Sequence, residues 1–130
     1  MTGRVGRGAA LAALLLAANL LTACTAANGA GGPPPTAPSG GAVITAHDIK
    51  FDSAQLHIPA GTPFQLLFDN RDGAPHNVTI YDDGAAQPLF VGEIFGGPAS
   101  RLYHVPAIAP GPHRFRCDVH LEMTGTVTAG

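Results

Sequence analysis

The chain has 130 residues, of which 45% are hydrophobic and 12% are charged, and its formal net charge is −2. Seven Lys and Arg residues stand against nine Asp and Glu, with no basic cluster. This composition excludes the positively charged surface that nucleic-acid-binding proteins need, so we expect no nucleic-acid partner.

The first 23 residues are typical of a bacterial export signal. Two arginines precede an apolar stretch at residues 9–21, which is within signal-peptide length and short for a bilayer span. The stretch ends in Leu-Thr-Ala-Cys24, which resembles the lipobox of bacterial lipoproteins. This resemblance implies cleavage before Cys24 and lipidation of its thiol. An ordinary signal peptide with a chance cysteine, or an uncleaved anchor, is the alternative.

Residues 24–41 contain Gly, Pro, Ala, Ser, Thr and Asn but no charge after Cys24, which predicts a disordered linker. Residues 42–130 have the length of one domain. A lipid before the linker and a domain after it describe a tethered protein rather than a membrane-spanning one. We therefore expect an exported protein held on the outer face of the cell membrane, or on the outer membrane in the periplasm.

After residue 42 the sequence shows no sustained helical period. Short apolar or β-branched runs alternate instead with turns rich in Gly, Pro, Asn and Asp. This pattern predicts an all-β sandwich of about eight strands, antiparallel or mixed. The predicted strands are residues 43–51, 55–58, 64–69, 76–81, 89–94, 101–105, 113–117 and 124–128.

One loop near the C-terminus concentrates potential metal ligands. Cys117, His120 and Met123 follow one another with two residues between each pair. Sulfur ligands select soft metals, imidazole suits copper and zinc, and a thioether adds nothing for zinc. Two His, one Cys and a weak axial Met form the ligand set of a blue copper site, so one further His is needed.

Strand alternation identifies His76 as the candidate for that ligand. Successive strand residues face opposite sides, so Cys117 shares the apolar face of Phe115, and His76 shares the face of Val78. An inward imidazole needs partners for its nitrogens, and a metal is one. The alternative is a buried histidine satisfied by hydrogen bonds alone.

These residues resemble the ligand motifs of the cupredoxins, the small blue copper proteins such as plastocyanin and amicyanin. The motifs are Pro75-His76-Asn77 and Cys117-x-x-His120-x-x-Met123, the latter with amicyanin-like spacing. The resemblance covers residues 42–130 and implies a Greek-key sandwich that holds one copper ion, cycling between Cu(I) and Cu(II). It implies His76, Cys117 and His120 as the trigonal ligands and Met123 as the long axial one. Pro75, Asn77 and Asp118 would support them, with Asn77 joining the two ligand loops.

Two positions depart from the cupredoxin pattern. Asp118 stands where the family often has Thr or Ser, and Leu121 stands where amicyanin-like loops have Pro. Our hypothesis is that Asp118, together with Glu122, adds negative charge that favours Cu(II). The remaining histidines show no pairing at short spacing and are expected to be ordinary surface or edge residues: His47, His57, His104 and His113.

The resemblance predicts an electron carrier rather than an enzyme. We expect a monomer that meets redox partner proteins through an apolar patch around His120, formed with Val119, Leu121 and Pro75. The alternative is an extracytoplasmic copper-binding protein for delivery, storage or sensing. The linker lacks the Met- or His-rich composition that this alternative predicts.

Overall fold

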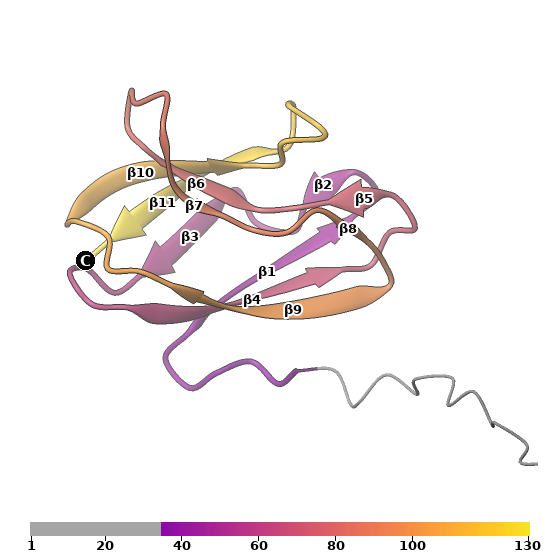
Figure 1. Cartoon of the computed structure of the whole chain (residues 1–130), viewed down its shortest axis with the longest axis horizontal. Coiled ribbons are helices and arrows are strands. Elements are labelled where there is room, and N and C mark those ends of the chain that lie inside the picture. Colours follow the sequence, from indigo (N-terminus) through magenta and orange to yellow (C-terminus); the bar gives the residue numbers. More distant parts are fainter. Residues whose placement is uncertain (1–34) are drawn as a thin grey trace, which may run out of the picture. The chain divides into compact units, whose positions relative to one another are not determined.

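The computed structural model describes residues 35–130, and that part of the chain is built from β-strands without helices (Figure 1). The strands are β1 (Ala42–His47), β2 (Lys50–Phe51), β3 (Gln55–Ile58), β4 (Phe64–Asn70), β5 (Pro75–His76), β6 (Thr79–Asp82), β7 (Pro88–Val91), β8 (Phe95–Gly96), β9 (Ala99–Val105), β10 (Gly111–Arg116) and β11 (Thr124–Ala129). The predicted all-β class is confirmed.

Two sheets face each other to form the sandwich (Figure 1). One has the order β2-β1-β4-β9 and the other the order β3-β11-β10-β6-β7. Most pairs are antiparallel, but β1 pairs with β4, and β3 with β11, in parallel. The sheets are therefore mixed, and the short pair β5-β8 lies apart from both.

Two predicted strands are divided in the structure, and a third ends early. The run 43–51 reverses at Asp48 and Ile49, whose φ angles of 53° and 56° form a two-residue hairpin turn between β1 and β2. The run 76–81 leaves the ladder at Asn77 and Val78, and the run 89–94 ends at Val91. Together with the additional short strand β8, these divisions give eleven strands within the described residues instead of the eight expected.

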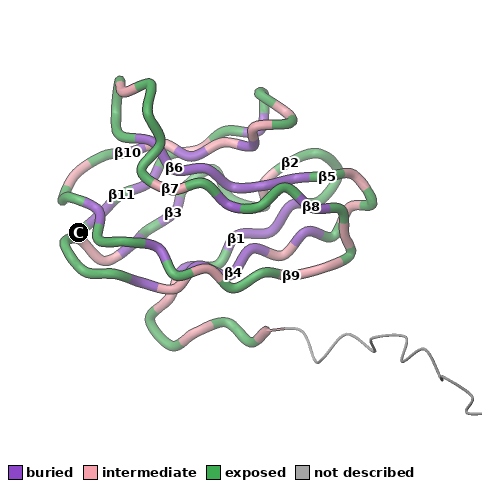
Figure 2. The backbone as a smooth tube through the Cα atoms, viewed as in Figure 1, coloured by how far each residue is buried: buried purple, intermediate pink, exposed green. Residues whose placement is uncertain are grey.

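The core lies between the sheets and follows the alternation of each strand (Figure 2). In β10 the buried Phe115 lies between the half-buried Arg114 and Arg116, and Cys117 directly after the strand is fully buried. His76 is also fully buried. The inward orientation predicted for both residues from alternation is confirmed.

His113 does not fit the surface or edge position expected for it. It is 5% exposed, and its Nε2 donates a hydrogen bond to the Ala109 carbonyl at 2.8 Å. It lies on the core face because it is two residues before Phe115 in the same strand. His47, His57 and His104 are exposed, as expected.

The export signal, Cys24 and the linker up to residue 34 lie outside the described residues. β1 begins at Ala42, the first residue of the expected domain. Among residues 35–130, the structure contains no helix with the length and apolarity needed to cross a membrane.

Phe115 gives a test of the core beside the ligand loop. Its ring is 1% exposed, so Phe115→Ala should lower the free energy of unfolding by about 3–5 kcal/mol through lost burial and a cavity. Val91, which is 57% exposed, supplies the control, and Val91→Ala should change stability by about 0.5 kcal/mol or less. Denaturant unfolding of the metal-free protein measures both, and equal effects would contradict this description of the core.

Candidate metal centre

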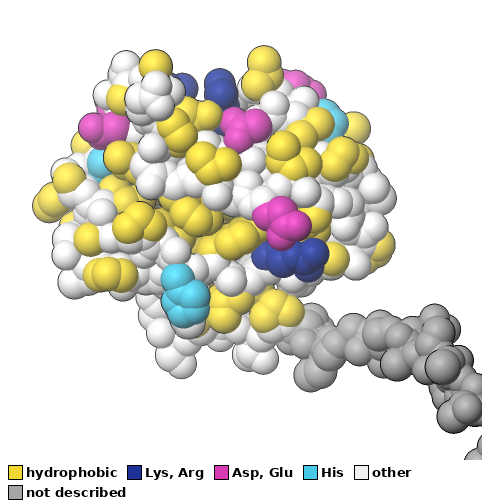
Figure 3. All heavy atoms as spheres, in the orientation of Figure 1, with side chains coloured by type: hydrophobic (Ala, Val, Ile, Leu, Met, Phe, Trp, Pro, Cys, Tyr) yellow, Lys and Arg dark blue, Asp and Glu magenta, His cyan; other side chains and the backbone are white. Residues whose placement is uncertain are grey.

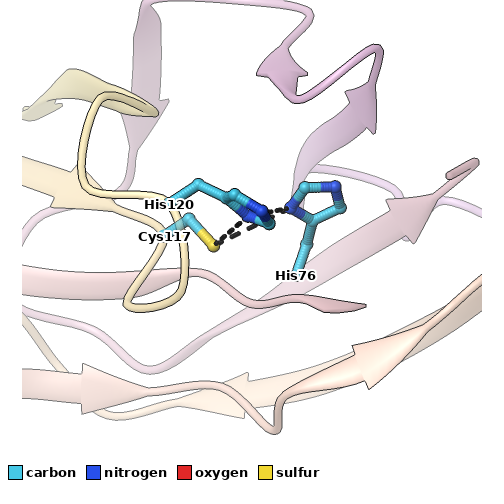
Figure 4. Close-up of side chains that lie close together, drawn as sticks. All are labelled: His76, Cys117 and His120. Atoms are coloured by element: carbon cyan, nitrogen blue, oxygen red, sulfur yellow. Dashed lines mark hydrogen bonds between the residues drawn. The ribbon is translucent and has the colours of Figure 1, made fainter. Parts of the chain in front are cut away.

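Three predicted ligands converge at one end of the sandwich (Figure 4). His76 comes from β5, Cys117 directly follows β10, and His120 lies in the loop before β11. The Cys117 Sγ lies 3.8 Å from the Nδ1 of His76 and 3.9 Å from the Nδ1 of His120. The two Nδ1 atoms are 3.1 Å apart.

This triangle of donor atoms has the size of a metal site. The circle through three atoms with these separations has a radius of about 2.1 Å, comparable with metal–nitrogen and metal–sulfur bonds of about 2.0–2.3 Å. A thiolate and two imidazoles form a donor set for copper or zinc. The residues present therefore fit a single bound ion at the centre of the triangle.

Asp72 determines which nitrogen of His76 faces the triangle. The Nε2 of His76 lies 2.9 Å from the Asp72 carboxylate, which as an ion can only accept a hydrogen bond. Nε2 therefore carries the proton, and Nδ1 presents its lone pair towards Cys117 and His120. Asp72 was not among the predicted site residues, and its only signal in the sequence is a carboxylate four residues before a candidate ligand.

The ligand loop is closed by its own backbone. The N–H of Cys117 donates to the Met123 carbonyl at 2.9 Å, and the N–H of Met123 donates to the His120 carbonyl at 2.9 Å. Met123 itself is 3% exposed. The two-residue spacings thus produce a compact turn that keeps the three residues of the motif close together.

Asn77 joins the His76 strand to the ligand loop. Its side-chain oxygen accepts the N–H of Asp118 at 2.8 Å, and its amide donates to the Asp118 carboxylate at 2.9 Å. The same amide contacts the Gly92 carbonyl and the Thr79 hydroxyl. Because Asn77 is fully buried, its own polar atoms are shielded from water, and the bonds to Asp118 hold the two ligand segments together.

The family model described as "Cupredoxin-like domain" matches residues 11–129. This chain belongs to the cupredoxin-like family. Among curated proteins, none matches it.

Solved structures of cupredoxins share the fold. Reduced auracyanin from Roseiflexus castenholzii superposes with a TM-score of 0.61 at 19% identity, covering 73% of this chain and 99% of that one. Auracyanin A from Chloroflexus aurantiacus, described as a "blue" copper protein, superposes with a TM-score of 0.58 at 18% identity, covering 68% of this chain and 96% of that one. Amicyanin from Paracoccus versutus superposes with a TM-score of 0.55 at 22% identity, covering 72% of this chain and 84% of that one. At these identities the similarity concerns the fold.

In this cupredoxin the Asp118 carboxylate is the centre of a hydrogen-bond network. It accepts hydrogen bonds from Thr79, Tyr81 and Arg116 as well as Asn77. Burial opposes its ionisation, but these four donors outweigh burial and hold the pKa of Asp118 below its usual value. The Arg116 guanidinium also forms an ion pair with this carboxylate and offsets part of its charge.

Three exposed apolar residues are neighbours of the ligands in sequence. Val119 is 41% exposed and Leu121 is 62% exposed, on either side of the half-buried His120. Pro75, directly before the buried His76, is also exposed. Hydrophobic side chains also gather on the face that carries β7 and β9, among scattered charges (Figure 3).

The lowered pKa of Asp118 predicts a pH dependence of stability. Its stabilising contribution should be complete above its unfolded-state pKa of about 3.9 and should be lost as the pH falls through the lower folded-state pKa. Asp118→Asn should cost about 2 kcal/mol at pH 7, because it breaks charge-assisted hydrogen bonds.

This difference should shrink at acid pH, where the wild-type carboxyl is also neutral. Denaturant unfolding of the metal-free wild type and Asp118→Asn between pH 7 and about pH 2 measures it. The comparison removes the contributions of other carboxylates, which are common to both proteins. A difference that stays constant across this range would contradict the role assigned to the Asp118 charge.

Proposed function

We propose that this protein is a membrane-tethered blue copper protein that carries single electrons between redox partners outside the cytoplasm. The observation that carries this proposal is the convergence of His76 Nδ1, Cys117 Sγ and His120 Nδ1 in one triangle. Met123, buried on the same loop, would complete the ligand set as the weak axial thioether. When bound in this set, one copper ion supplies one-electron oxidation and reduction.

The surroundings of the ligands suit repeated electron transfer without rearrangement. His76 and Cys117 are fully buried, and their loops are joined by hydrogen bonds through Asn77. Such a site presents the same donors to both oxidation states, so little has to move when an electron arrives. Burial of the thiolate also opposes exchange of the ion with external ligands, which favours a carrier over a protein that delivers copper.

His120 provides the route for electrons to a partner. It is the one of the three donors that is half-buried rather than buried. The exposed side chains of Val119 and Leu121 beside it in sequence, and of Pro75 beside His76, would offer apolar surface to a partner protein. Such contacts would bring a partner's redox centre close to the imidazole. The lipid proposed on Cys24 would confine these encounters to a membrane surface.

The absorption spectrum tests this proposal. The purified protein titrated with Cu(II) should bind one equivalent and become intensely blue, because a Cu–thiolate bond absorbs visible light by charge transfer. Cys117→Ser should lose this band. Cys24→Ser is the matched control, since it removes the other cysteine of the chain. It should keep the band and lose association with the membrane fraction.

Two outcomes would contradict the proposed function. A wild-type protein that binds Cu(II) without a thiolate charge-transfer band would show that Cys117 is not a ligand. A blue protein that gives up Cu(I) to a weak chelator faster than it exchanges electrons with a small redox reagent would favour the copper-handling alternative.

A further inference from the structure

Beyond the ligands themselves, we propose that Asp72 is the positioning residue of the metal centre: its carboxylate fixes the ring of His76 and ties that ring to the tip of the β1–β2 hairpin. This inference rests on the proposed function for its effect on copper. Its structural part concerns the metal-free protein as well.

Three N–H groups converge on the Asp72 carboxylate. Oδ2 accepts from His76 Nε2 at 2.9 Å and from the backbone N–H of Ile49 at 3.0 Å. Oδ1 accepts from the backbone N–H of Asp48 at 2.9 Å. One carboxylate therefore connects the hairpin tip to a buried candidate ligand that is far from the tip in sequence.

Asp72 is itself held in place from the other side. Its backbone N–H donates to the side chain of Asn70, which is fully buried and donates to the carbonyls of Ala74 and Phe95. The backbone carbonyl of Asp72 accepts the N–H of Gly97 at 2.8 Å. A Cβ on Gly97 would overlap the carbonyl oxygens of Asn70 and Asp72, so this close approach requires glycine. The carboxylate is thus fixed before any metal binds.

The hairpin tip has an unusual backbone that the carboxylate stabilises. Ile49 has a φ of 56°, a left-handed conformation that is costly for a β-branched residue. Its N–H and that of Asp48 are both bonded to Asp72, which offsets part of this cost. Ile49 also lines a surface groove together with Met123, so the hairpin tip adjoins both ligand-bearing segments.

The hydrogen bond has an electronic consequence for the metal. An anion that accepts the Nε2–H raises the basicity of the Nδ1 lone pair. A more basic imidazole stabilises Cu(II) more than Cu(I), because the ion with the higher charge gains more. Asp72 therefore favours the oxidised form and lowers the reduction potential.

Asp72→Asn and Asp48→Asn separate positioning from charge. The carboxylates of Asp48 and Asp72 lie within 4.8 Å of each other, but no hydrogen bond joins the Asp48 side chain to His76 among the described residues. Each variant removes one negative charge from the region around the hairpin tip. Asn also tolerates the left-handed backbone at position 48, where φ is 53°.

In the full-length protein, Asp72→Asn should weaken Cu(II) binding about 10- to 100-fold, the usual effect of losing a partner of a ligating histidine. Cu(I) binding should weaken less, and each tenfold difference raises the reduction potential by about 59 mV. Asp48→Asn should change Cu(II) affinity by about twofold or less, as expected for an exposed charge. Equal changes in the two variants would overturn the positioning role.

The metal-free wild type provides a second, independent readout. Its ¹⁵N-detected imidazole signals should show His76 as the tautomer protonated at Nε2, and a proton on Nδ1 would overturn the inference even if no variant folds. A protein that has this tautomer but stays colourless with Cu(II) would refute the proposed function and leave the positioning role intact. The two failures are therefore distinguishable.

Discussion

The hydrogen bonds between Asn77 and Asp118 are the constraint on which the rest of the structure depends. They join two residues 41 positions apart, each directly beside a candidate ligand. Without them no other side-chain hydrogen bond described above would join the segment of β5 directly to the loop after β10. The oxygen and the nitrogen of the buried Asn77 side chain are both hydrogen-bonded. This fixes the separation of the two segments, and with it the separation of the donor atoms of His76 and Cys117.

The other contacts around the site act on the same two segments. Asp72 orients His76 from the side of the β1–β2 hairpin, and the backbone of Met123 closes the ligand loop around Cys117. Strand alternation turns the side chains of His76 and Cys117 inward. The hydrogen bonds around them then fix the orientation of these side chains. The sheets and these hydrogen bonds together therefore bring the three donor atoms within 4 Å of one another.

Much of the site could be predicted from sequence because its signals are local. The spacing of Cys117, His120 and Met123 within one loop can be recognised without knowing the fold. The alternation of apolar residues was enough to predict that His76 faces inward. Asp72 was missed because its role depends on where the hairpin tip lies, which no local pattern encodes. The division of the 43–51 run was also missed, since β-branched Ile49 argues for a strand whereas the Asp72 carboxylate stabilises a turn.

The fold holds one sulfur and two imidazole nitrogens in an arrangement that fits a single copper ion. X-ray absorption at the copper edge, recorded on the oxidised and reduced protein, tests this arrangement most directly. We predict one short Cu–S bond and two Cu–N bonds in both states, with lengths that change little on reduction. A copper environment without the short sulfur bond, or one that loses a nitrogen ligand at neutral pH on reduction, would contradict the account.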